Sequence, residues 1–203
     1  MKLSEDEIKR RLKSMSMGIS NIAEITLKDK TEKRYFGLQF YDLDVKFKKE
    51  NYDEIEKKIQ IISDKLFQNR DLMLFKTKNG IHFVSLMLDL THSLSYYRRR
   101  AGKISKKLEQ NYKFKREKYL VLRISPKKKE VIDKFNQKPK MVIVNPRPKF
   151  FRLVNKPSSE MMISSEHLKI YNHFIGLPQP ILNMYLESKI IKTKAKLHAY
   201  RTR

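Results

Sequence analysis

The sequence predicts an α+β domain built on a mainly antiparallel sheet. Short runs of β-branched and aromatic residues alternate with segments whose apolar residues recur at helical spacing. Asn79-Gly80, between two apolar runs, is a strong hairpin signal and indicates antiparallel pairing. The apolar fraction of 40% in 203 residues is sufficient for one core, so we expect a single domain over 1–203. We expect its helices on one face of the sheet and a basic groove over the other.

The first elements are a helix and a hairpin. Ser4 with Glu7 three residues later matches a capping box and predicts a helix over 4–15, within an N-terminal appendage of residues 1–20. Alternating and then continuously apolar residues predict strands over 21–27 and 34–43, with a polar turn between them. The second strand is expected to end at a pair of aspartates.

A second helix and a second hairpin follow. Asn51 and Glu54 form another capping signature, and a stripe of Ile55, Ile59, Ile62 and Leu66 repeats at helical spacing. This pattern predicts a helix that packs one face on the sheet. Residues 71–76 and 81–87 are short apolar runs on either side of the Asn79-Gly80 turn, and they predict two paired strands.

The middle of the chain is strongly basic. Residues 98–118 hold ten Lys or Arg and two Glu, which is typical of either a solvated helix or a basic finger. Residues 119–125 predict a strand that Pro126 ends. We expect a turn of helix over 130–135 and a further strand over 141–146.

The last third is expected to be mostly helical. Residues 147–159 are punctuated by proline and predict a loop. A helix is expected near 164–174, with its histidines in solvent, because His167 and His173 stand six residues apart and not four. A final helix is expected from Pro180 toward Lys194, and the basic segment 189–203 is expected to form an exposed tail.

The net charge indicates a polyanionic partner. Lys and Arg number 46 against 22 Asp and Glu, which gives a formal charge of +24 and an isoelectric point near 10.1. Contacts between cations and phosphates release counterions, so nucleic acid is the first candidate. We expect no membrane partner, because no apolar run approaches the ~20 residues of a spanning helix and the N-terminus lacks a signal-peptide core. A soluble cytoplasmic protein is the resulting expectation.

Two aspartates form the first candidate site. Asp42 and Asp44 stand at i and i+2 near a strand end, so their side chains point to the same face of the sheet. Such a pair can hold Mg²⁺ or Mn²⁺, since these hard cations prefer carboxylate oxygens. In the alternative interpretation, Asp44 starts a turn and Asp42 pairs with a lysine. Further along, Gly80 precedes His82 by two residues, and an imidazole at that place can donate to a phosphate.

Both motifs resemble those of the archaeo-eukaryotic primase superfamily, which includes small primase subunits and primase-polymerases. That family carries a hydrophobic residue followed by Asp-x-Asp at a strand end, then Gly-x-His or Ser-x-His on a hairpin strand. This chain has "QFYDLDV" and "KNGIHFV" with a predicted helix between them, over roughly 34–88. The resemblance implies a primase-like sheet of the RRM or palm type. It also implies metal-dependent nucleotidyl transfer in DNA replication.

The resemblance assigns roles to individual residues. Asp42 and Asp44 would bind the catalytic Mg²⁺ or Mn²⁺, and His82 would contact the triphosphate of the incoming nucleotide. Lys76 and Lys78 would add phosphate contacts. The implied partners are nucleoside triphosphates and DNA, either single-stranded or as template-primer, with RNA as an alternative. A larger primase subunit or a helicase are further candidate partners.

The chain departs from the family at one position. The family has a third acidic residue on a later strand, where this chain reads "VLRIS" with Arg123. One alternative is therefore a catalytically inactive primase-like subunit that binds nucleic acid. Another is a two-carboxylate enzyme in which Arg123 and Lys127 bind phosphate. A basic nucleic-acid-binding protein that uses neither motif is a third.

A candidate nucleic-acid surface lies in the basic segment. Rings next to cations suit stacking on unpaired bases with phosphate contacts beside them. The alternative is a helix with a buried Tyr and a solvated basic face. The residues concerned are Tyr96, Tyr97, Arg98, Arg99, Arg100, Lys103, Lys106 and Lys107.

Overall fold

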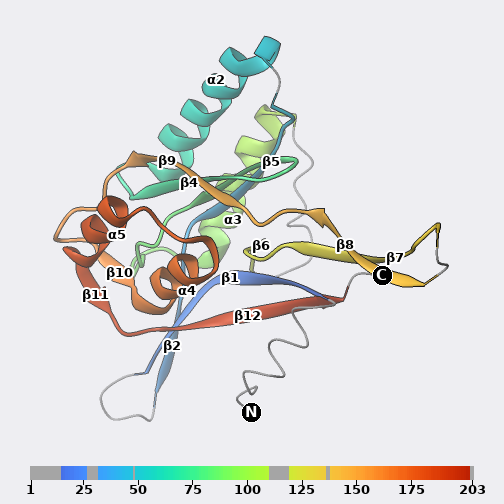
Figure 1. The fold of residues 1–203 in the computed structure, drawn as a ribbon. Helices are drawn as coiled ribbons and strands as arrows, with labels where there is room; N and C mark the ends of the chain where they lie inside the picture. Colours follow the sequence, from blue (N-terminus) through green and yellow to red (C-terminus); the bar gives the residue numbers. More distant parts are fainter. Residues whose placement is uncertain (1–14, 27–31, 48, 110–118, 136–137, 202–203) are drawn as a thin grey trace.

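The computed structural model describes residues 15–26, 32–47, 49–109, 119–135 and 138–201. Within these residues the fold is α+β, with sheets that are antiparallel apart from one short parallel pair, so the predicted class is confirmed (Figure 1). The predicted helix over 4–14 lies outside the described residues. Met15 already belongs to a strand, and residues 15–20 of the predicted N-terminal appendage lie within that strand.

The first sheet is centred on β1 (Met15–Thr26). β12 (Lys194–Arg201) pairs along one side of it, and β6 (Val121–Arg123) and β2 (Lys33–Gly37) share the other side. The hairpin of β1 and β2 was predicted. The exposed tail predicted over 189–203 is wrong, because the segment from 189 forms β11 (Lys189–Ile191) and β12. The final helix predicted from Pro180 is confirmed, but it ends at Leu186 and does not run toward Lys194. The lysines of β12 alternate with residues that pack against β1, which a count of charges does not reveal.

The second sheet has the order β3-β5-β4-β9. Its strands are β3 (Phe40–Asp44), β5 (Gly80–Val84), β4 (Leu72–Lys76) and β9 (Lys149–Asn155). The β4–β5 hairpin is confirmed. The predicted strand over 34–43 is divided, since residues 38–39 lead the chain from the first sheet into the second. The loop predicted over 147–159 is wrong over most of its length, because β9 pairs with β4 at the edge of the sheet. The prolines of this segment lie outside β9, so they do not interrupt its hydrogen bonds.

Two helices cover one face of this second sheet, as Figure 1 shows. α2 (Tyr52–Ile62) continues into one π-helical turn over Ser63–Phe67, and α3 (Leu94–Lys107) lies beside it. Their apolar stripes pack on alternate residues of the strands, among them Tyr41, Leu43 and Phe83. Asn51 is the N-cap residue of α2, as predicted, but its side chain accepts no hydrogen bond from a helix N–H, and its amide donates to the carbonyl of Lys46.

The other face of the second sheet is not an open basic groove, which corrects the sequence prediction. Phe40, Met73, Phe75 and Val84 pack there in a core shared with the first sheet and with α4 (Ser165–Ile175). α5 (Gln179–Leu186) and the parallel pair of β11 with β10 (Met162–Ser164) complete this side. On this face, Asp42 and Asp44 at the end of β3 are exposed.

A two-stranded ribbon projects from the body of the molecule, at the right of Figure 1. It consists of β7 (Lys127–Ile132) and β8 (Pro139–Asn145). The predicted turn of helix over 130–135 is therefore wrong, since β7 occupies residues 130–132. The strand predicted over 141–146 is confirmed as β8. Among the described helices, none is long and apolar enough to cross a membrane.

Candidate functional site

Asp42 and Asp44 lie on one face of β3, as the period of a strand requires. Their neighbours Tyr41 and Leu43 are buried against the helices, while both aspartates are exposed. The side chain of Asp42 is 46% exposed. The two carboxylates therefore reach solvent at the end of the sheet, where a ligand can approach them.

His82 lies directly across from Asp42. β3 and β5 pair in a register that sets Asp42 opposite His82 and Asp44 opposite Gly80. The Nε2 atom of His82 is 3.7 Å from the Oδ1 atom of Asp42. Burial of the imidazole, with the positive charge of Arg123 nearby, lowers the pKa of His82 to about 3, although Asp44 opposes the shift. His82 is thus neutral at physiological pH and can offer one N–H to an oxygen of a ligand.

Gly80 is required by the same pairing. A Cβ atom added there would stand 1.9 Å from the carbonyl oxygen of Leu43, well inside the contact distance of the two atoms. The amide of Val45 also donates to the carbonyl of Asn79 at 2.9 Å, which continues the contact past the end of the strand. Glycine therefore allows β3 and β5 to approach closely where Asp44 lies, which is a structural role. The phosphate contact predicted for Gly80 stays a prediction.

Arg123, on β6 of the first sheet, lies near enough to Asp42 for their charges to interact. Burial lowers the pKa of its guanidinium, and the negative charge of Asp42 opposes that shift. The group donates to the carbonyl of Ser125 and, at 2.7 Å, to that of Pro146. A cation is thus held close to Asp42 and His82.

Two other acids of the chain, Asp89 and Asp133, form hydrogen bonds elsewhere in the fold. Asp89 accepts hydrogen bonds from Arg70, Thr91 and His92 in the turn before α3. Burial favours the protonated form of Asp89, but the hydrogen bonds outweigh it and lower its pKa to about 2. Asp133 accepts the amide of Phe135 in the ribbon. Neither residue belongs to the Asp42 site.

The predicted phosphate-binding lysines surround the site unevenly. The Nζ of Lys76 lies 4.1 Å from the centroid of the Phe47 ring, and that of Lys78 donates to the carbonyl of Val144 at 2.9 Å. Lys127 is exposed at the first position of β7. Lys78 and Arg123 therefore both donate hydrogen bonds to backbone carbonyls at the end of the β7–β8 ribbon, beside the candidate site.

The basic helix α3 is not part of this site. Its residues Ala101, Ile104 and Leu108 pack on the face of the sheet opposite to Asp42. Tyr97 is 5% exposed and lies under the Arg70 guanidinium, so its ring does not fit the predicted stacking on bases.

The remaining predicted residues of α3 form a solvated basic surface. Tyr96 stacks on His92, with the ring centroids 4.4 Å apart, and Arg100 donates to the carbonyl of Lys65. Arg99, Lys103, Lys106 and Lys107 are exposed, and Arg98 is half-buried. The alternative of a buried Tyr with a solvated basic face describes this helix.

The histidine of α4 also corrects the sequence prediction. His167, expected in solvent, is fully buried. Its two ring nitrogens contact the hydroxyl of Ser164 and the carbonyl of Ser20, each at 2.8 Å. Because both nitrogens are occupied within the core, His167 is a structural residue.

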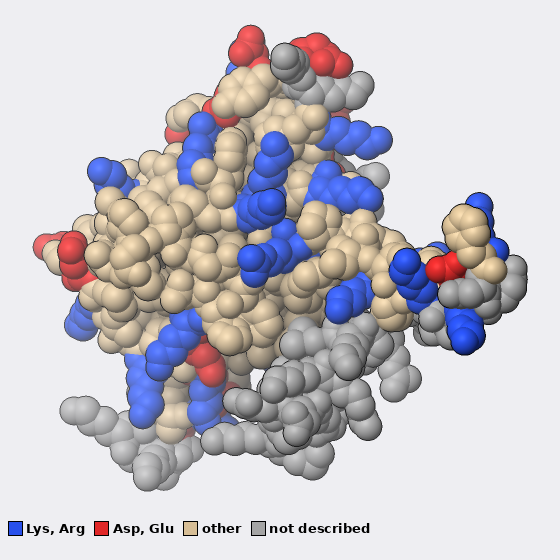
Figure 2. Space-filling model, viewed as in Figure 1, with Lys and Arg blue, Asp and Glu red and all other residues tan. Residues whose placement is uncertain are grey.

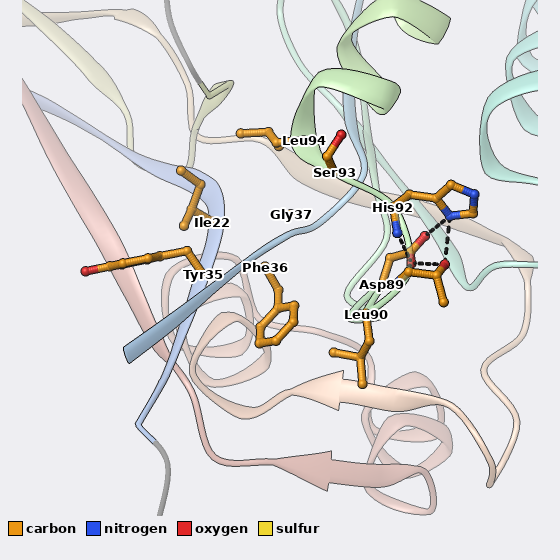
Figure 3. Close-up of a pocket in the computed structure, with 10 residues that line it drawn as sticks. Ile22, Tyr35, Phe36, Gly37, Asp89, Leu90, His92, Ser93 and Leu94 are labelled. Carbon is orange, nitrogen blue, oxygen red and sulfur yellow. Dashed lines mark hydrogen bonds and ion pairs between the residues drawn. The ribbon is translucent and has the colours of Figure 1, made fainter. Parts of the chain in front are cut away.

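The structure also contains a pocket away from the Asp42 site, which the sequence did not predict. It holds about 290 Å³ between β2 and the turn before α3, and Tyr35, Phe36, Leu90 and Leu94 are among its lining residues (Figure 3). In the same view, Asp89 and His92 are joined by hydrogen bonds along the pocket wall. Its lining comes from segments more than fifty residues apart, so no local pattern could have indicated it.

The donor set at Asp42 suits one hard cation. Mg²⁺ is commonly held by one or two carboxylates together with water and substrate phosphates, and the two exposed aspartates meet that requirement. In the described part of the chain, no group of three or more Asp, Glu, His or Cys side chains is arranged to hold an ion. Comparisons with models of protein families, with curated proteins and with solved structures found no match to this chain.

Proposed function

We propose that the protein is a primase-like nucleotidyltransferase that acts on a nucleic-acid template, with Asp42 and Asp44 as metal ligands. The observation that carries the proposal is the pairing of Asp42 with His82 across β3 and β5. Two short motifs, forty residues apart in the sequence, supply two carboxylates and a neutral imidazole to one end of one sheet. Such a group can bind a metal ion and a triphosphate side by side.

Each side chain has a distinct task in this proposal. A bound Mg²⁺ or Mn²⁺ would lower the pKa of the attacking hydroxyl and neutralise charge on the phosphates. Asp42 and Asp44 would hold this metal ion at the end of the sheet. His82, kept neutral by its burial, donates one N–H to a phosphate oxygen without adding a positive charge. Arg123 offers a guanidinium to a phosphate that reaches Asp42.

The test is nucleotide incorporation by the full chain. Purified protein is incubated with labelled nucleoside triphosphates, Mg²⁺ or Mn²⁺, and primed or unprimed single-stranded templates. Incorporation is expected, and Asp42→Asn with Asp44→Asn should abolish it. Asp53→Asn, an equally charged change at an exposed position of α2, should retain it. No incorporation on any template, or full activity in the double variant, would contradict the proposal.

The guanidinium of Arg123 favours a second candidate, a non-catalytic nucleic-acid-binding protein. A cation beside Asp42 weakens the attraction of the site for a second metal ion, which two-metal transfer needs. This candidate predicts no incorporation and unchanged nucleic-acid binding in the double aspartate variant. The incorporation assay and a binding assay on the same preparations separate the two.

A further inference from the structure

The β7–β8 ribbon combines charge and exposed apolar surface. Four of the large exposed hydrophobic side chains of the described chain belong to it or to its tip: Ile132, Phe135, Met141 and Ile143. The lysines of the ribbon and its tip include Lys127, Lys128, Lys129, Lys134 and Lys140. In Figure 2 the projecting ribbon carries several basic side chains beside the tan surface.

The two faces of the ribbon differ in character. The register pairs Ile132 with Pro139, Glu130 with Met141, and Lys128 with Ile143, so Ile132, Met141 and Ile143 lie on one face. The opposite face carries Lys129 and Lys140, which alternate with valines. Within the described residues, β7 and β8 pair only with each other. Ile132, Met141 and Ile143 are thus exposed on one face, which Lys128 shares, and Lys129 and Lys140 lie on the other.

Phe135 stands at the tip with its side chain fully exposed. The carboxylate of Asp133 accepts the backbone amide of Phe135 at 2.9 Å, and the amide of Asp133 donates to the carbonyl of Lys138 at 2.9 Å. These bonds fix the turn from which the ring projects. The ring contributes nothing to either core, so burial does not account for an aromatic residue at this place.

The base of the ribbon is fastened to the candidate site. Arg123, which faces Asp42, donates to the carbonyl of Pro146 just after β8. Lys78, in the turn that leads to Gly80 and His82, donates to the carbonyl of Val144. Six residues of β7 at about 3.4 Å each extend about 20 Å. A strand of nucleic acid along the ribbon would therefore lead to Asp42.

We propose that the β7–β8 ribbon binds single-stranded nucleic acid, with an unpaired base stacked on Phe135 and phosphates on the ribbon lysines. Unpaired bases expose apolar faces beside a charged backbone, which matches both surfaces of the ribbon. A duplex hides those faces in its stack, so it would satisfy the lysines and leave Ile132, Met141 and Ile143 in water. The single strand is therefore the polyanion that the ribbon fits best.

The experiment measures fluorescence anisotropy of a labelled oligothymidylate with the full chain, without nucleotide or metal ion. Phe135→Ala should weaken binding about 5- to 150-fold, the range that loss of one base–aromatic stack gives, with an unchanged salt slope. Phe135→Trp should restore it. Tyr52→Ala, which removes an exposed ring from α2, is the matched control and should bind as the wild type does.

The lysines are tested by the salt dependence. Lys129→Gln with Lys140→Gln should lower the slope of log affinity against log salt by about 1.4, since each phosphate contact on a single strand contributes about 0.7. A duplex with as many phosphates should bind more weakly and be indifferent to Phe135→Ala. These changes leave both cores intact, so thermal melting should match the wild type.

Two outcomes would overturn the inference. If Phe135→Ala binds oligothymidylate as the wild type does, no base stacks on the tip. If the duplex binds as tightly as the oligothymidylate, the ribbon does not select unpaired bases. Retained binding in both ribbon variants would instead assign this surface to a protein partner. Because the assay contains no metal or nucleotide, its failure is distinct from failure of the proposed transferase activity.

Discussion

Two carboxylate centres lie at opposite ends of the β3-β5-β4-β9 sheet, and their surroundings differ. Asp71, just before β4, is fully buried and accepts hydrogen bonds from Ser85, Leu86, Met87 and Tyr185. Asp42, near the end of β3, is half exposed beside a buried imidazole and a guanidinium. Burial raises the pKa of Asp71, against the effect of those hydrogen bonds.

This comparison separates a structural carboxylate from a candidate functional one. The donors to Asp71 come from the segment after β5 and from α5, so its carboxylate joins parts of the fold that are distant in the sequence. Asp42 and Asp44, in contrast, are exposed at the other end of the sheet. Loss of the first centre should therefore unfold the protein, and loss of the second should impair binding.

The largest expected effect is on stability at Asp71. Asp71→Ala should lower the free energy of unfolding by about 3–5 kcal/mol, because several buried donors would lose their acceptor. Asp42→Ala should change it by less than about 0.5 kcal/mol, as exposed positions usually do. Urea denaturation measures both. If both variants lost the same free energy of unfolding, Asp71 would not be a structural carboxylate in contrast to Asp42.

Next in size is the close approach at Gly80. Gly80→Ala should cost about 3 kcal/mol, since the added methyl would collide with the carbonyl of Leu43 and separate β3 from β5. Binding of Mn²⁺, followed by electron paramagnetic resonance, should be lost as well. Gly176→Ala is the control: its positive φ of 79° also makes alanine unfavourable, but Mn²⁺ binding should persist. Persistent Mn²⁺ binding in Gly80→Ala would separate this glycine from the site.

A third prediction concerns acid. His82 and His167 are neutral in the fold, with their pKa values lowered by burial to about 3 and about 4, whereas both titrate near 6.5 when unfolded. The unfolded chain therefore takes up protons first, and stability falls as the pH drops below about 6.5 toward those values. Each histidine contributes a slope of up to about 1.4 kcal/mol per pH unit.

Denaturation between pH 7 and pH 5 checks this slope. His82→Gln should remove the contribution of His82 to the slope of unfolding free energy against pH and leave the contribution of His167. An unchanged slope in His82→Gln would show that its imidazole is not held neutral beside Asp42.

The smallest expected effect is at Arg123. Arg123→Gln should tighten Mn²⁺ binding about 3- to 10-fold, because it removes a positive charge that repels the ion near Asp42. Arg152→Gln is the matched control, since that guanidinium pairs with Glu56 of α2. Equal Mn²⁺ affinities in the wild type and in Arg123→Gln would mean that Arg123 does not act on the site.

The sequence by itself determined the local features of the site. The strand that ends at Asp44, the shared face of the two aspartates and the turn before Gly80 follow from alternation and turn chemistry, which act between near neighbours. The apolar stripe of α2 was likewise sufficient to place that helix. The class of fold follows from the same patterns.

Tertiary structure alone decided what faces those residues. The register that sets His82 against Asp42, the arrival of Arg123 from another sheet, and the burial of His167 depend on contacts across forty or more residues. In the ribbon, β8 was predicted but β7 was missed, because the lysines of β7 lack the apolar alternation of a strand packed on a core. β7 is extended because of its backbone hydrogen bonds to β8, and not because of its own composition.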